Sequence, residues 1–179
     1  MDHQLKIDKT GFETHSHRDI SFPFRSSCVK ISKYIGNRFV GHWHYEPEFT
    51  LIKSGKLFYQ AADTVYEMEK GDIVFVNSGI MHSAWLGNSE DCEYMPFSFS
   101  VTMVAGEKKS AIDQKYVSEI VRNENFPSIL LRSTDPEYDE VLKVLLHCYD
   151  EFEKRDGCFE LKIKSEICIL WSMLYRIYR

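Results

Sequence analysis

The sequence lacks any long apolar run, any excess of basic residues and any paired cysteine spacing. No stretch of about 18 apolar residues occurs, so no transmembrane helix is expected. The N-terminal segment, Met1 to Lys6, has no apolar core of the kind that signal peptides carry. The formal net charge of −5 disfavours nucleic acid binding by the chain as a whole, and no segment resembles a basic recognition helix. We therefore expect a cytoplasmic protein that binds no membrane.

The cysteine and nucleophile patterns exclude two further classes of protein. The five cysteines are scattered, odd in number and without CxxC spacing, which predicts reduced, mostly buried thiols rather than a disulfide framework. They are Cys28, Cys92, Cys148, Cys158 and Cys168. The sequence also has no Ser/His/Asp arrangement, nucleophile elbow or phosphate-binding loop. Any catalysis would therefore have to depend on a bound metal.

The composition is that of a folded domain, and its character changes near residue 105. With 179 residues, 44% of them hydrophobic, the chain is long enough for one domain with a substantial core. Before residue 105, short β-rich segments alternate with turn residues every 8–12 residues or so, as is typical of a sandwich or barrel. The expected strands are residues 28–35, 39–44, 49–52, 56–60, 64–68, 73–76, 82–85 and 96–104, with turns at 54–55 and 62–63.

The C-terminal third has the periodicity of two helices. Thr134 and Glu137 form a capping box that predicts the start of the first helix, and Gly157 predicts its end. The second helix contains residues 167–175, which are apolar almost all round, so we expect burial on more than one side. No helix-stop residue precedes Arg179. We therefore expect either a fragment of a longer protein or a dimer surface at the end of the helix.

Four polar residues in the β-rich part form a candidate site. His42, His44 and Glu48 have the same parity, and residues two apart on a strand share a face at a separation of about 6.6 Å. Glu48 can join the two histidines past the irregularity at Pro47. His82 follows a different strand and meets the others only through the tertiary fold. We expect all four side chains to point into one pocket.

Two segments resemble the two sequence motifs of the cupin family. The residues that match at the motif spacings are Gly36, His42, His44, Glu48 and Gly55 in the first segment, and Gly71, Asn77, Gly79 and His82 in the second. Asn77 stands where cupins usually have proline, and Leu86 stands where the second motif often ends in asparagine. These departures leave the four ligand positions intact and put the shape of the second turn in doubt.

A longer stretch, from His42-Trp43-His44 through Gly71-Asp72-Ile73 to His82-Ser83, resembles the effector-binding domain of AraC-type transcription regulators. In that family a cupin barrel is followed by a pair of helices that often dimerise, and then by a helix-turn-helix DNA-binding domain. The resemblance implies a mainly β fold, a cupin double-stranded β-helix barrel followed by a C-terminal antiparallel helix pair. It divides the chain into an N-terminal arm (1–20), the barrel (21–105) and a helical segment (106–179).

The same resemblance implies a function. The chain would sense a small-molecule effector, a sugar or related metabolite, and would form a homodimer through its C-terminal helices. It would contact DNA only through a domain beyond residue 179, and it would be neither an enzyme nor dependent on a cofactor. The alternative is a metal-dependent cupin enzyme, a dioxygenase or isomerase that acts on a small polar substrate. A third hypothesis is a metal-free storage or interaction barrel.

Two interpretations of the four pocket residues stay open. Three imidazoles and one carboxylate, from His42, His44, His82 and Glu48, suit a divalent zinc, nickel, iron or manganese ion and would leave coordination positions open. Alternatively, the same side chains are polar pocket walls that hydrogen-bond an organic effector, as in AraC-type sensors, which require no metal. Arg38 shares the parity of His42, so it would either grip a carboxylate or sugar hydroxyl in the pocket or lie at a solvated strand end.

The other conspicuous residues have structural interpretations. Trp43 has the opposite parity and is expected to pack against the sheet. His15 and His17 are expected to lie on the N-terminal arm, which could fold over the pocket with Phe22 and Phe24. His147 is expected to be structural, among the core positions of the first C-terminal helix, and residues 107–109 are expected to form a solvated loop.

Overall fold

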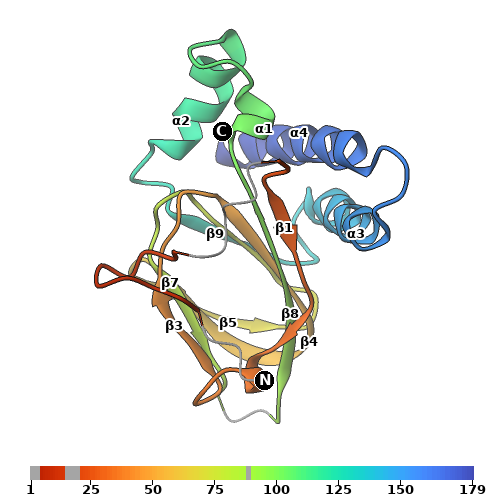
Figure 1. The fold of residues 1–179 in the computed structure, drawn as a ribbon. Helices are drawn as coiled ribbons and strands as arrows, with labels where there is room; N and C mark the ends of the chain where they lie inside the picture. The colour runs from red at the N-terminus through yellow and green to blue at the C-terminus, as the bar shows by residue number, and fades with distance from the viewer. Residues whose placement is uncertain (1–4, 15–20, 88–89) are drawn as a thin grey trace.

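The computed structural model describes residues 5–14, 21–87 and 90–179. In these ranges a nine-stranded antiparallel sheet curls into a barrel, and the helices gather beside β1 and the upper end of β8 (Figure 1). The strands are β1 (Phe24–Ser26), β2 (Val29–Lys30), β3 (Arg38–His42), β4 (Glu48–Ala61), β5 (Thr64–Glu69), β6 (Ile73–Val76), β7 (His82–Trp85), β8 (Cys92–Phe99) and β9 (Ser128–Leu131). The helices are α1 (Thr102–Ala105), α2 (Ser118–Val121), α3 (Tyr138–Lys154) and α4 (Phe159–Tyr178). The predicted barrel followed by a helix pair is confirmed.

β4 shapes the barrel because it belongs to both of its layers. Its first half pairs with β6 and β8, and its second half pairs with β5 and β7. A register shift between Ile52 and Ser54 bends the strand between the two layers. Gly55 has a φ of +78°, and a Cβ there would lie 2.1 Å from the carbonyl oxygen of Asp91. The predicted turn at residues 54–55 is therefore wrong, because glycine here permits a bend within one continuous strand.

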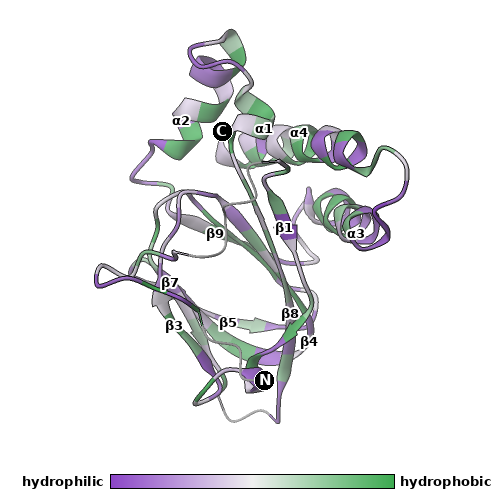
Figure 2. Ribbon diagram, in the orientation of Figure 1, coloured by the Kyte–Doolittle hydropathy of each residue, from purple (hydrophilic) through white to green (hydrophobic). Residues whose placement is uncertain are grey.

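Side chains along β4 alternate between its two faces, and each face contributes to a different apolar core. Ile52 belongs to the core inside the barrel, whereas Phe49 and Leu51 belong to a second core between the sheet and the helices. Figure 2 shows apolar and polar residues side by side along α3 and α4, as expected for helices that cover a sheet with one face. The helices therefore cover the outer face of the sheet, and the pocket lies inside the barrel.

Two expected strands are shorter than the sequence predicts. In the segment 28–35 only Val29–Lys30 is a strand, and Ile31–Lys33 forms a single 3₁₀ turn that buries Ile31 in the barrel. β8 begins earlier than predicted, at Cys92, and ends at Phe99, after which the chain turns into α1. The predicted hairpin around residues 62–63 is confirmed by the pairing of β4 with β5.

The segment after residue 105 is not wholly helical. A π-helical turn (Asp113–Val117) leads into α2, and the chain then returns to the sheet as β9. β9 pairs with β6 along its whole length, from Ser128 opposite Val76 to Leu131 opposite Ile73. An unpaired edge leaves backbone groups without partners, and β9 satisfies those of β6. The helical segment predicted for residues 106–179 thus contributes a strand to the barrel.

The ends of α3 differ from the predicted caps. Among the residues that the structure describes, no side chain caps the start of α3, so the predicted capping bond of Thr134 is absent. Instead Asp135 accepts a hydrogen bond from the Arg132 backbone N–H at 2.7 Å and shapes the loop before the helix. At the other end, Arg155 takes the left-handed conformation, with a φ of +50°, that Gly157 was expected to supply. Gly157 follows two residues later, in the loop.

α4 packs on more than one side, as its apolar composition predicts. α3 and α4 lie antiparallel, and Glu151 pairs with Lys162 and His147 with Glu166 between them. On the other side, the Trp171 ring meets Phe99 of β8. The remaining face stays exposed, with Leu161 and Ile169 on it. Neither α4 nor any other helix in the described ranges meets the length and hydropathy of a membrane span.

The thiols are free but not mostly buried. The five cysteines all lie in described ranges and are free there. Cys92 and Cys148 are buried, whereas Cys158 and Cys168 are exposed on the helix pair. The prediction of mostly buried thiols is therefore wrong, because α4 leaves part of its surface uncovered.

Candidate functional site

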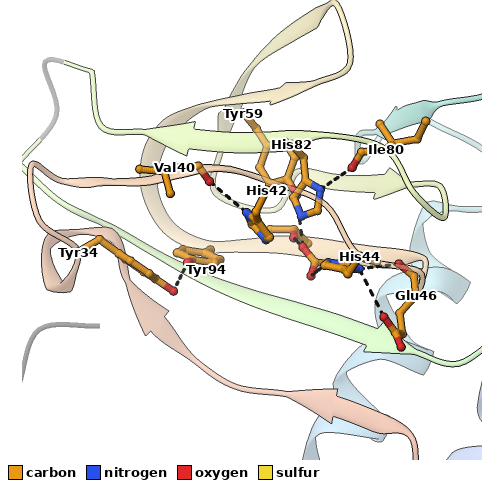
Figure 3. Close-up of polar contacts among 11 residues, drawn as sticks. Tyr34, Val40, His42, His44, Glu46, Tyr59, Ile80, His82 and Tyr94 are labelled. Atoms are coloured by element: carbon orange, nitrogen blue, oxygen red, sulfur yellow. Dashed lines mark hydrogen bonds and ion pairs between the residues drawn. The ribbon is translucent and has the colours of Figure 1, made fainter. Parts of the chain in front are cut away.

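The four residues that the sequence singled out lie together inside the barrel. His42 ends β3, His44 follows it, Glu48 begins β4 and His82 begins β7. His42 lies directly opposite His82 across the β3–β7 pair, which brings the two imidazole ring centroids to 4.2 Å. All four side chains are buried, with exposed fractions between 2% and 9%. Figure 3 shows the three rings turned toward one another.

Backbone carbonyls fix the orientation of the three histidine rings. The Nδ1 atoms contact the carbonyl oxygens of residues 40, 46 and 80, in each case two residues away along the chain, at 3.1, 2.8 and 2.9 Å respectively (Figure 3). Because a carbonyl oxygen only accepts, each Nδ1 carries a proton, and in a neutral ring Nε2 then carries none, as in His42 and His82, whose pKa values are lowered. One ring nitrogen from each of His42, His44 and His82 lies within 4.8 Å of the others.

Glu48 stands beside this triad rather than within it. One carboxylate oxygen accepts hydrogen bonds from Thr50 at 2.9 Å and Tyr59 at 3.3 Å. The other oxygen lies 3.7 Å from Nε2 of His44. The predicted set of four ligands is thus a compact group of three histidines, with a carboxylate that the neighbouring hydroxyl groups hold in place.

Burial and mutual charge set the protonation of the cluster. Burial, reinforced by the neighbouring imidazole of His42, lowers the pKa of His82 to about 3. Burial also lowers the pKa of His42, although the Glu48 carboxylate partly offsets it. Burial by itself would raise the pKa of Glu48, but the contact with His44 and the nearby imidazoles outweigh it and lower that pKa to about 2. Burial acts to lower the pKa of His44, and Glu48 outweighs it and leaves that pKa raised. At neutral pH a carboxylate therefore faces an uncharged His82.

The donor set fits a divalent transition-metal ion. Metal-binding histidines commonly donate one ring N–H to a backbone carbonyl, which orients the other nitrogen toward the metal, and all three rings have this arrangement. Within the described part of the chain, Nε2 of His82 is buried and has no hydrogen-bond partner. A buried nitrogen without a partner is costly, and a cation would satisfy it.

Arg38 does not join the cluster. The register of β3 against β7 shifts between Phe39 and His42, so that β3 carries one extra residue there. The bulge changes the parity: Phe39 and His42 are buried, whereas Arg38 is exposed. The pocket position predicted for Arg38 from its spacing to His42 is therefore wrong. Arg38 lies at a solvated strand end, which is the other prediction for it.

A cavity of about 570 Å³ adjoins the cluster. His42 and Glu48 form part of its wall, together with Phe39, Tyr34 and Tyr94 of the barrel. The Tyr94 hydroxyl donates a hydrogen bond to the Tyr34 hydroxyl at 3.1 Å (Figure 3). Sequence reasoning missed these two tyrosines, because their partnership joins segments sixty residues apart.

The cavity also extends to the helix pair. Phe152, Arg155, Phe159 and Glu160, at the corner between α3 and α4, line this end of it. Phe22 and Phe24 line the cavity as well. Phe24 belongs to β1 and packs edge-on against Phe152 at a ring-centroid distance of 5.3 Å. These phenylalanines therefore form part of the cavity wall and do not belong to a separate arm. Another missed wall residue is Arg25 of β1.

The remaining sequence candidates lie away from the cavity wall. Trp43 packs outside the barrel against Phe12 at 4.8 Å and donates its indole N–H to the Thr10 carbonyl, as expected for a sheet-packing residue. His147 is exposed and pairs with Glu166 at 2.7 Å, so it links α3 to α4 on the surface and not in the core. Residues 107–109 are exposed between α1 and the π-helical turn, as predicted. His15 and His17 lie outside the described residues.

Comparison with known protein families decides what this barrel with a helix pair is. Residues 25–159, more than half of the chain, match the family described as the AraC-like ligand binding domain. The chain belongs to this AraC-like family. Its barrel, cavity and helix pair are therefore those of a ligand-binding domain.

One curated protein and two solved structures are similar to this chain. An uncharacterized HTH-type transcriptional regulator of Bacillus subtilis (strain 168), YdeC, is 24% identical over 168 residues, which are 94% of this chain and 57% of YdeC. The chain thus spans little more than half the length of that relative. ToxT from Vibrio cholerae O395 has a similar fold, with a TM-score of 0.51 and 13% identity over 87% of this chain and 57% of ToxT. A cupin 2 conserved barrel domain protein from Salinispora arenicola CNS-205 matches 50% of this chain and 73% of its own, with a TM-score of 0.41 and 19% identity.

Proposed function

We propose that this AraC-like domain senses a small-molecule effector and relays its binding to a DNA-binding domain elsewhere in a longer regulator. The observation that carries the proposal is a cavity lined both by the barrel cluster, at His42 and Glu48, and by the α3–α4 corner, at Phe152 and Phe159. A ligand in that cavity would touch the barrel and the helix pair at once. Effector binding could therefore favour one arrangement of the helices over another.

Aromatic contacts give the relay a physical route. Phe24 packs against Phe152 at 5.3 Å, and Phe22 packs against Phe159 at 5.6 Å, so strand β1 and the α3–α4 corner share one interface. Packed side chains favour discrete arrangements over continuous deformation. A ligand that changed the packing of Phe152 or Phe159 would shift the helix pair as a unit.

The partners follow from the family and from the exposed surface. The effector would be a sugar or related metabolite, and the domain would form a homodimer through α3 and α4, where Leu146, Leu161 and Ile169 are exposed. DNA would be contacted through a helix-turn-helix domain, as the class of the relative YdeC suggests. The protein would act in the cytoplasm and would not be an enzyme.

The test uses the product of the whole gene, whatever sequence follows residue 179. A metabolite library is screened for compounds that raise its Tm, and each compound found is then tested for its effect on binding to DNA from the gene's own promoter. We expect at least one compound to change DNA affinity. Phe159→Ala should weaken this coupling, whereas Phe58→Ala, a matched change away from the cavity, should not. If no compound changes DNA binding, or if the gene encodes no DNA-binding segment, the proposal fails.

A second candidate, a metal-dependent cupin enzyme, is favoured by one specific observation, the buried Nε2 of His82 without a partner. His42, His44 and His82 would hold a zinc, nickel, iron or manganese ion, with Glu48 alongside. Such an ion would supply Lewis-acid or oxygen chemistry, while the barrel would orient a small polar substrate. We propose that a metal, where bound, serves the sensor and is not required for it.

Elemental analysis of protein purified without chelators or metal columns tests the metal. His82→Ala removes one donor of the triad, and His147→Ala removes an exposed histidine that lies outside it. If the site binds metal, the wild type and His147→Ala carry one equivalent and His82→Ala carries much less. Equal metal in all three proteins, or none in the wild type, rejects the metal and with it the enzyme alternative. Turnover of a dioxygenase or isomerase substrate that Glu48→Ala abolishes would favour the enzyme over the sensor.

A further inference from the structure

Arg25 faces the inside of the barrel although it lies on an edge strand. In the β1–β8 pair Arg25 is directly opposite Ser98, and in the β4–β8 pair Ser98 is directly opposite Glu48. Directly paired residues of antiparallel strands put their side chains on the same face of the sheet. Arg25, Ser98 and Glu48 therefore form a row across three strands, and all three line the cavity.

The Arg25 guanidinium has no carboxylate partner in the described part of the chain. Elsewhere on the surface Arg132, Arg176 and Arg179 each make an ion pair with an aspartate or glutamate. The other arginine in the cavity wall, Arg155, lies over the rings of Phe152 at 4.8 Å and Phe159 at 5.8 Å. Arg25 makes neither kind of contact and is exposed at the cavity wall.

The carboxylate at the far end of this row, that of Glu48, has partners of its own. Glu48 is held by Thr50 and Tyr59 on one oxygen and lies close to His44 on the other. Neighbouring strands are spaced about 4.8 Å apart, so Arg25 and Glu48 start from backbones roughly 10 Å apart. The cavity, of about 570 Å³, leaves room for a body of about one ring beside the apolar surfaces of Phe39, Tyr34 and Tyr94.

We infer that Arg25 binds the carboxylate of the effector, so that the ligand is a small carboxylic acid whose apolar body points toward the histidine cluster. This inference rests on the proposed sensing function and puts a carboxylic acid in place of a neutral sugar as the ligand class for the same cavity. Arginine binds a carboxylate through two parallel N–H···O bonds. A singly charged carboxylate suits the cavity better than a doubly charged phosphate, because Glu13, Glu48 and Glu160 also lie in its wall.

Isothermal titration calorimetry on the 179-residue chain tests the inference. The probes are phenylacetate and 3-methylbutanoate, each with its uncharged amide, together with phenyl phosphate and a neutral sugar, L-arabinose. We expect each acid to bind about tenfold more tightly than its amide, as charge-assisted hydrogen bonds require. Arg25→Met should weaken acid binding to the level of the amide, and Arg25→Lys should retain part of it. Arg38→Met is the matched control, because Arg38 is exposed outside the cavity, and it should bind like the wild type.

Several results would overturn the assignment. These are amides that bind as tightly as acids, acid binding unchanged in Arg25→Met, or neither acid binding with a Kd below about 1 mM. Tighter binding of phenyl phosphate than of both acids would replace carboxylate with phosphate as the ligand group. L-arabinose binding that survives Arg25→Met would refute the role of Arg25 and leave the sensing function intact. A failure of every compound to alter DNA binding by the whole gene product would remove the sensing function itself.

Discussion

The Asn77 side chain joins the barrel to the segment that leads into β9, so its replacement should destabilise the whole domain. Its amide nitrogen donates to the carbonyls of Ile120 at 2.9 Å and Phe126 at 3.0 Å, and its amide oxygen accepts from the Ser78 N–H at 2.8 Å. Asn77 is buried, with 3% of its surface exposed. Asn77→Ala therefore removes three hydrogen bonds and leaves their partners without a replacement.

The magnitude follows from those three bonds. Each lost bond costs on the order of 1 kcal/mol, so we expect the free energy of unfolding to fall by about 3 kcal/mol. In a domain of this size that corresponds to a Tm lower by roughly 6–12 °C. Asn77→Asp should cost at least as much, because an ionised carboxylate cannot donate to the two carbonyl oxygens and would lie against them.

Urea unfolding followed by tryptophan fluorescence measures the change. Asn125→Ala is the matched control, because Asn125 is exposed and its side chain makes no hydrogen bond within the described residues; its effect should stay within about 0.5 kcal/mol. If Asn77→Ala and Asn125→Ala unfold at the same urea concentration with the same slope, the three bonds contribute nothing. That outcome would refute the argument that Asn77 holds the segment to the barrel.

Three further predictions concern the bend in β4, acid stability and thiol reactivity. Gly55→Ala should prevent soluble folding or lower the free energy of unfolding by more than about 3 kcal/mol, because its Cβ would lie 2.1 Å from the Asp91 carbonyl oxygen. Gly106→Ala is the control: Gly106 has a φ of +63° and no atom within 4 Å of the added Cβ, so the loss should be only about 1 kcal/mol. Equal urea midpoints for the two variants would contradict this prediction. Burial acts to raise the pKa of Asp91, but hydrogen bonds from Ser32 and Cys92 outweigh this effect and lower that pKa. The Asp91 carboxylate therefore stabilises the fold above about pH 4, and this stabilisation is lost as the pH falls below that value. Asp91→Asn should therefore flatten the acid side of a plot of unfolding free energy against pH, and an unchanged slope would refute this. Burial raises the pKa of the Cys148 thiol to about 12, whereas Cys158 is exposed. A thiol reagent at pH 8 should therefore modify Cys158 in the native protein and Cys148 only in urea. Mass spectrometry that finds Cys148 modified first would contradict this prediction.

The candidate site shows where local sequence patterns suffice. His42 and His44 are two residues apart, and their side chains do point into one pocket, as strand geometry requires. The same parity rule fails for Arg38, because a bulge in β3 inserts one residue between it and His42. A bulge is set by pairing with another strand, so the spacing of two residues on one strand cannot reveal it.

The residues that line the rest of the cavity depend on long-range pairing. Arg25 faces the interior because β1 pairs with β8, and Tyr34 meets Tyr94 across sixty residues of chain. Similarly, β9 could not be expected from its own residues, because it is placed by the open edge of β6. The motif departure at Asn77 also acquires a reason only in the fold, where its backbone N–H donates to the Pro127 carbonyl at 2.8 Å, a bond that the usual proline could not make.

The sequence by itself determined the short strands, the two helices and the shared face of His42 and His44, because each depends on residue periodicity over a few positions, and the resemblance to cupins added the barrel and the place of His82. The tertiary structure alone decided that Arg25 lines the cavity and Arg38 does not, that Glu48 stands beside the triad, and that the α3–α4 corner shares the cavity with the barrel. Those features arise from strand register and from helix packing between segments distant in sequence. Periodicity determines which face of an element is apolar, and only packing determines what lies opposite that face.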